Sequence, residues 1–177
     1  MKFLFELMLS MLMLTHGSSS DPLTREDVQN YLKTHHLQYA DAKIVNDRSA
    51  LLVDVKGEHA KASILTKSAD NKLLMQPNEY VWEEDEEGIS VERLGRYLCV
   101  VIHDKARSHD MDFVNIVYVD DNGDERKDRY YFNGKQAIII PMPTRKESLV
   151  VAIYGNDGFI QDMVKRFPET VLQQNHL

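Results

Sequence analysis

The sequence predicts an α+β protein that is mainly β, with an N-terminal helix and a small antiparallel sheet followed by an immunoglobulin-like β-sandwich. Three observations predict this class. A helix-capping pattern begins shortly after residue 21, and apolar and polar residues alternate through most of the chain that follows. In the second half, apolar runs recur at roughly 8–12-residue intervals and are separated by turn-forming residues, which is typical of a sandwich.

The first twenty residues have the composition of a cleavable signal peptide. Lys2 is followed by a mostly apolar run over 7–14 and by small residues at 17–20. The run is shorter than the roughly 20 residues that span a bilayer, so we expect no membrane span after cleavage. The chain is therefore expected to be secreted or periplasmic. Glu6, a charge beside the apolar run, departs from the pattern, and a buried N-terminal helix is the alternative.

Charge and cysteine content narrow the class of partner. The formal net charge is −7, which argues against binding to a phosphate backbone, so no nucleic acid is expected as a partner. Cys99 is the only cysteine, so an internal disulfide is impossible and stability must come from the core. Cys99 lies in an apolar run and is expected to be buried.

Residues 21–82 are expected to form one helix and several antiparallel strands. Thr24 is placed as the N-cap and Asp27 as the N3 partner of a capping box, with the helix ending near His36. The later part of this segment alternates or is apolar between polar turns, which predicts strands. The expected strands cover 40–44, 51–55, 60–64 and 73–75.

Residues 83–88 are predicted to be an acidic linker between two units. Five adjacent carboxylates repel one another and favour a solvated segment. An aromatic residue beside such a run can anchor a partner, so we expect partner-binding residues here. The predicted binding segment is Trp82, Glu83, Glu84, Asp85, Glu86 and Glu87.

Residues 89–177 carry the sandwich pattern. The predicted strands are Ile89–Leu94, Tyr97–Ile102, Phe113–Val119, Arg129–Phe132, Ala137–Ile140 and Leu149–Tyr154. Asn-Gly pairs at 122–123 and 133–134 favour turns with positive φ. Apolar residues at helical spacing predict a C-terminal helix over 159–167, with a strand as the alternative.

The loop between Ile102 and Phe113 is densest in metal-ligand residue types. His103, His109, Asp110 and Asp112 could supply nitrogen and oxygen donors to a divalent metal, although no ligand-spacing motif is present. A second acidic loop begins at Asp120 but lacks the glycine and glutamate of an EF-hand. A polar hairpin is the expectation there, with a looser calcium site as the alternative.

No catalytic motif emerges, which favours a secreted or periplasmic, non-enzymatic binding or assembly module. Such a module would recognise another protein through loops or a sheet edge, and no cofactor is expected. One alternative is a secreted inhibitor or immunity-type protein whose acidic face covers a basic partner. The other is a metal-dependent hydrolase that uses the His103–Asp112 loop. The oligomeric state is left open.

Overall fold

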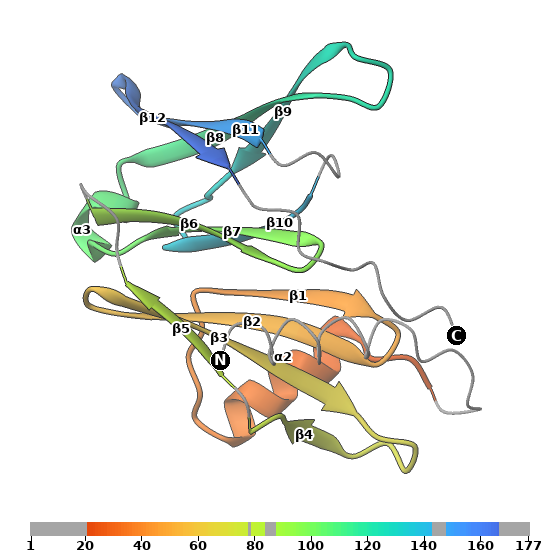
Figure 1. Ribbon diagram of the computed structural model, residues 1–177. Helices are drawn as coiled ribbons and strands as arrows, with labels where there is room; N and C mark the ends of the chain where they lie inside the picture. Colours follow the sequence, from red (N-terminus) through yellow and green to blue (C-terminus); the bar gives the residue numbers. More distant parts are fainter. Residues whose placement is uncertain (1–20, 78, 84–87, 143–147, 167–177) are drawn as a thin grey trace.

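The computed structural model describes residues 21–77, 79–83, 88–142 and 148–166. The predicted signal peptide and most of the acidic linker lie outside these residues. The described chain is mainly β, with one N-terminal helix and three antiparallel sheets stacked in layers, as Figure 1 shows. The N-terminal helix and the first sheet (sheet A, within residues 41–83) form the lower half in this view. Sheet B (within residues 89–141) lies in the middle, and sheet C (within residues 111–166) lies on top.

Helix α2 (Arg25–Thr34) begins where the sequence predicts, because its capping is entirely local. The Thr24 side chain accepts a hydrogen bond from the Asp27 N–H, and the Asp27 carboxylate accepts one from the Thr24 N–H at 2.9 Å. This is the expected capping box. Val28 is the buried residue of the helix and packs, with Leu23, onto one face of sheet A.

Sheet A has five strands, with the free edge of β1 at one side. The strand order is β1-β2-β3-β4, and β5 pairs with the other half of β3's outer edge. The strands are β1 (Asp41–Asn46), β2 (Ser49–Lys56), β3 (His59–Lys67), β4 (Leu73–Met75) and β5 (Tyr80–Glu83). The first four match the predicted runs, whereas β5 was not predicted as a strand.

Sheets B and C are formed by the second half of the chain. Sheet B has the order β10-β7-β6, and sheet C has the order β12-β11-β8-β9. Their strands are β6 (Ile89–Leu94), β7 (Tyr97–Ile102), β8 (Met111–Val119), β9 (Glu125–Tyr131), β10 (Ala137–Pro141), β11 (Ser148–Gly155) and β12 (Gly158–Arg166). A short helix, α3 (Lys105–Ser108), joins β7 to β8.

Sheet B is the central layer and is covered on both faces. Alternate residues of β7 point to opposite sides: Leu98 and Val100 belong to the core shared with sheet C, whereas Cys99 and Val101 belong to the core shared with sheet A. This accounts for the continuous apolar run of β7, because a strand buried on both faces has no polar side. Cys99 is buried, as expected.

The predicted C-terminal helix is wrong, because residues 158–166 form strand β12. Its backbone pairs with β11 from Gly155 opposite Gly158 to Ser148 opposite Arg166. The apolar spacing fitted a helix, but a tight turn at Asn156–Asp157 returns the chain directly along β11. Pairing with β11 satisfies the backbone N–H and C=O groups of β12 that face this neighbour, which the side-chain pattern alone did not reveal.

The two Asn-Gly pairs form different turns. At 133–134 both residues have positive φ, and this turn connects sheet C to sheet B. At 122–123 only Gly123 has positive φ. There the Asp120 side chain organises the tip by accepting hydrogen bonds from the Asn122 and Asp124 N–H groups.

Candidate functional site

The predicted partner-binding segment is only partly described. Residues 84–87 lie outside the described residues, and Glu83 is exposed at the end of β5. Trp82 is 7% exposed and packs in the core between sheets A and B. Its indole is therefore an interior group rather than a surface anchor, because β5 turns this side chain toward sheet B.

The structure does not bring the predicted metal ligands together. His103 is 5% exposed and lies at the end of β7, whereas His109 and Asp110 are exposed beyond α3. Within the described residues, which include all four predicted ligands, no group of three or more ligand side chains is placed to hold a metal ion.

His103 instead belongs to a buried hydrogen-bond chain that joins two sheets. Trp82 Nε1 donates to Ser90 Oγ at 2.9 Å, and Ser90 Oγ lies 2.7 Å from His103 Nε2. The His103 Nδ1 atom lies 3.2 Å from the carbonyl oxygen of Gly57, in the turn between β2 and β3. Trp82 and Gly57 come from sheet A, and Ser90 and His103 from sheet B, so the chain ties the two sheets together.

The donors and acceptors at the two ends of this chain are fixed by chemistry. An indole N–H can only donate and a carbonyl oxygen can only accept, so Ser90 Oγ accepts from Trp82 and His103 Nδ1 donates to the Gly57 carbonyl oxygen. Ser90 is 2% exposed, so its hydroxyl has no route to a substrate even though a histidine contacts it. Ser90 and His103 are consequently a structural pair, not a nucleophile and its base.

The other reactive or acidic groups also have structural roles. Burial raises the pKa of the Cys99 thiol, which disfavours the thiolate needed for nucleophilic chemistry. At the tip of the β8–β9 hairpin, the Arg126 guanidinium binds Asp120 at 2.9 Å and lowers the pKa of that carboxyl group. Asp120 is thus used within the turn, which confirms a polar hairpin loop there.

A groove of about 480 Å³ lies along the free edge of β1. All residues from 39 to 44 line it, together with residues of α2 and of the β9–β10 region. Neighbouring side chains of a strand point to opposite faces of the sheet. Six consecutive lining residues therefore mean that the groove follows the edge of the strand rather than one face of the sheet.

The backbone groups at this edge are directed into the groove. Lys67 N donates to Arg48 O, so the backbone groups of Arg48 point toward β3. The backbone groups of successive residues in a strand point in opposite directions, so every second residue after Arg48 also faces β3. The backbone groups of Leu51 and Val53, which lie between those residues, therefore point toward β1. Lys43 and Asp41 lie opposite Leu51 and Val53 and pair with them. The N–H and C=O groups of the intervening Ala42 and of Ile44 consequently point away from β2.

The groove has an apolar floor and a mostly cationic rim. Val28 is 4% and Ile139 is 5% exposed, and Leu32 and Ile44 are half-buried. The rim carries the three cationic side chains Arg25, Lys43 and Lys135. Its single carboxylate, Asp41, is only 10% exposed because Lys135 Nζ binds one oxygen at 2.6 Å and Ile139 N donates to the other at 2.9 Å.

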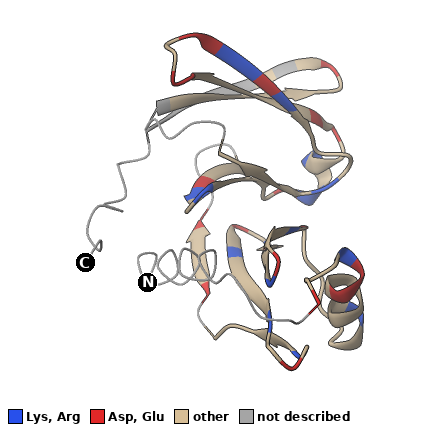
Figure 2. Cartoon of the chain, turned by 90° about the vertical axis from the view of Figure 1, so that its right-hand side faces the viewer, with Lys and Arg blue, Asp and Glu red and all other residues tan. Residues whose placement is uncertain are grey.

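The outer face of sheet C carries an aromatic cluster that is largely packed on itself. Phe113 stacks on Tyr154 with ring centroids 4.6 Å apart, and Arg129 lies 3.9 Å from the Phe113 centroid. Arg129 also donates to Asn115. Along the neighbouring edge strand β9, the alternating charges that Figure 2 shows at the top of the molecule protect the strand from pairing with another chain.

Sequence reasoning missed the groove and the buried hydrogen-bond chain. Arg25 and Lys135 are far apart in sequence, and no local pattern predicts that they border one cavity. Within the described residues, no helix is long and apolar enough to cross a membrane. Comparison with protein families, characterised proteins and solved structures gave no match.

Proposed function

We propose that this protein is a secreted or periplasmic, non-enzymatic binding module that takes an extended segment of a protein partner as an additional strand beside β1. The single observation that carries the proposal is the groove along residues 39–44. In strand addition, main-chain hydrogen bonds supply affinity and side-chain pockets supply selectivity. The β1 edge offers both, since the N–H and C=O groups of Ala42 and Ile44 face the groove and apolar side chains form its floor.

The comparison with β9 supports the choice of β1. Five of the seven residues of β9 are charged, which discourages pairing at that edge. In β1 only Asp41 and Lys43 are charged, and the Asp41 carboxylate is already engaged by Lys135 and Ile139. Of these two edges, β1 is therefore the one that remains suited to an added strand.

The remaining strands fit a scaffold for such a site. We infer that β6–β12 form an immunoglobulin-like sandwich, with sheets of three and four antiparallel strands enclosing one core. Domains of this architecture commonly present loops or edges to partners. The predicted signal peptide at residues 1–20 is the basis for proposing export.

Replacing Ala42 by proline tests the proposal. Proline removes the N–H that points into the groove and leaves the ladder between β1 and β2 intact, because edge strands tolerate proline where the N–H faces outward. The matched control is Lys127→Pro on edge strand β9. There Phe132 N donates to Asp112 O, so the backbone groups of Phe132 and of every second residue before it point toward β8. Lys127 lies between two such residues, and its N–H therefore points away from β8.

The assay is selection of a random peptide library on the folded chain, followed by amide hydrogen exchange with the selected peptides. We expect the wild-type and Lys127→Pro proteins to select the same peptides and the Ala42→Pro protein to lose them. Bound peptide should slow exchange of the Ala42 and Ile44 amides. Equal selection by the Ala42→Pro protein, or no protection of those two amides, would refute strand addition at β1.

A further inference from the structure

The two walls of the β1 groove differ in chemistry, and this difference specifies the partner. Ala42 and Ile44 lie opposite Leu52 and Ala50, whose side chains pack in the core beneath α2. The base of this side is apolar and includes Leu32 and Val28 of α2, whereas Arg25 and Gln29 of the same helix are the polar members of its lining.

The opposite wall is cationic. Lys43 lies opposite Leu51, which packs in the core shared with sheet B, so Lys43 belongs to the side of the groove that faces sheet B. Lys135 reaches this side from the turn before β10, where it binds Asp41 and remains 50% exposed. Lys43 has no ion-pair partner among the described residues. The positive charge on this wall therefore exceeds the negative charge of Asp41.

A strand added beside β1 would present alternate side chains to these two walls. Side chains of an extended segment point to opposite faces with a period of two residues. Those beside Ala42 and Ile44 would meet the apolar wall beneath α2, and those beside Lys43 would meet the cationic wall. Charge complementarity across such a contact selects one partner over another.

Because alternate side chains of an added strand would face the two sides of the groove, we infer that the segment bound at β1 is an extended acidic peptide in which apolar and acidic residues alternate. The inference rests on the proposed strand addition and adds the chemistry of the partner. The charged side chains that line the groove are mainly positive, whereas the whole chain has a net charge of −7. The rest of the molecule would therefore repel an acidic segment rather than attract it. Recognition would depend on Lys43 and Lys135.

The test measures fluorescence anisotropy of short labelled peptides of alternating valine and glutamate, alternating valine and lysine, and valine and glutamate in separate blocks. The alternating glutamate peptide should bind most tightly, and raising the salt concentration should weaken it. Lys43→Glu should lower its affinity about fivefold, the effect of one exposed ion pair of ordinary strength, and should raise the affinity of the lysine peptide. Lys127→Glu, a matched charge reversal on β9, should change neither.

Each outcome decides between the two proposals. If Ala42→Pro abolishes binding but the glutamate and lysine peptides bind equally, strand addition is retained and the acidic partner is refuted. If the block peptide binds as well as the alternating one, the two-wall match is refuted. If no peptide protects the Ala42 and Ile44 amides from exchange, both proposals fail.

Discussion

Replacement of Ser90 by alanine tests whether the buried hydrogen-bond chain holds sheets A and B together. In the native protein Ser90 Oγ accepts a hydrogen bond from Trp82 Nε1 and forms a second hydrogen bond with His103 Nε2. Alanine removes both interactions and leaves Trp82 Nε1 and His103 Nε2 without their partner. Both residues are buried, with Trp82 7% and His103 5% exposed. Each stranded group costs about 1–3 kcal/mol, so we expect a loss of about 3 kcal/mol in the free energy of unfolding.

Ser63→Ala is the matched control, because it makes the same chemical change at another buried strand position. Ser63 is fully buried in β3, and its hydroxyl has no hydrogen-bond partner among the described residues. Removing an unsatisfied hydroxyl should leave stability unchanged or raise it by about 1 kcal/mol. Urea unfolding measures both variants, and thermal unfolding should show Ser90→Ala melting about 9 °C lower, at about 3 °C per kcal/mol for a chain of this size.

A double-mutant cycle with Trp82→Phe isolates the interaction. Phenylalanine has no N–H to leave unpaired, so Trp82→Phe should cost less in the Ser90→Ala background than in the wild type. A coupling energy of about 1 kcal/mol or more is expected. Equal stability losses for Ser90→Ala and Ser63→Ala, or strict additivity of Trp82→Phe and Ser90→Ala, would refute the structural role of this chain.

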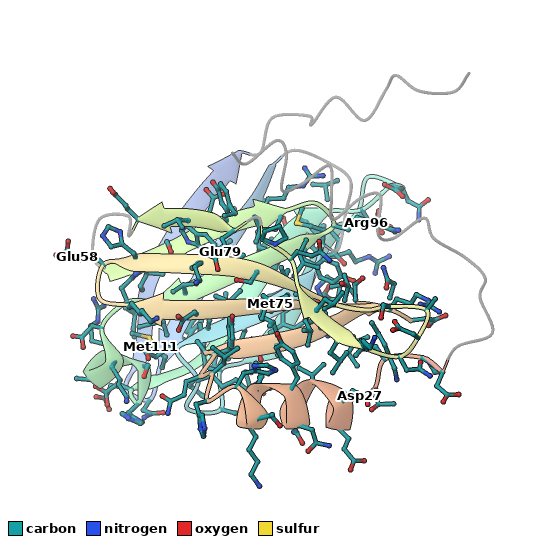
Figure 3. All side chains as sticks on the ribbon, turned by 90° about the horizontal axis from the view of Figure 1, so that it is seen from below. Asp27, Glu58, Met75, Glu79, Arg96 and Met111 are labelled. Carbon is teal, nitrogen blue, oxygen red and sulfur yellow. The ribbon has the colours of Figure 1, made fainter. Side chains whose placement is uncertain are left out.

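Two further variants test local features of the fold. Asp27, labelled beside α2 in Figure 3, has a lowered pKa because of the Thr24 N–H and Lys67. Its carboxylate stabilises the protein above the unfolded value of 3.8, and this is lost as the pH falls through the lower folded value. Asp27→Asn should therefore cost about 1 kcal/mol at pH 7 and nothing in strong acid, measured by urea unfolding; a pH-independent difference would contradict it. Gly155→Ala should cost about 2–3 kcal/mol by the same measurement, because its Cβ would lie 2.7 Å from the Asp110 carbonyl oxygen, whereas Gly57→Ala meets open space and should cost about 1 kcal/mol for its positive φ alone. Equal costs would contradict the steric argument.

The local elements could be predicted from the sequence because their causes are local. Thr24 and Asp27 close a capping box within one helical turn, and this interaction needs no tertiary contact. The strands from β1 to β4 were predicted from alternation and turn residues, which reflect which side chains face the core. Strand β12 was only the alternative to a predicted helix, because its apolar spacing satisfied a helix as well as a strand and the pairing with β11 decided between them.

The sequence by itself determined a capped helix, a strand-rich body and the burial of Cys99. Only the tertiary structure decided that Trp82 and His103 are interior groups, that the predicted metal ligands do not converge, and that Arg25, Lys43 and Lys135 border one groove. Periodicity reports which face of an element is buried, but it does not report which distant element covers that face. The binding groove depends on that second kind of information, because it exists only where the edge of β1 meets α2 and β10.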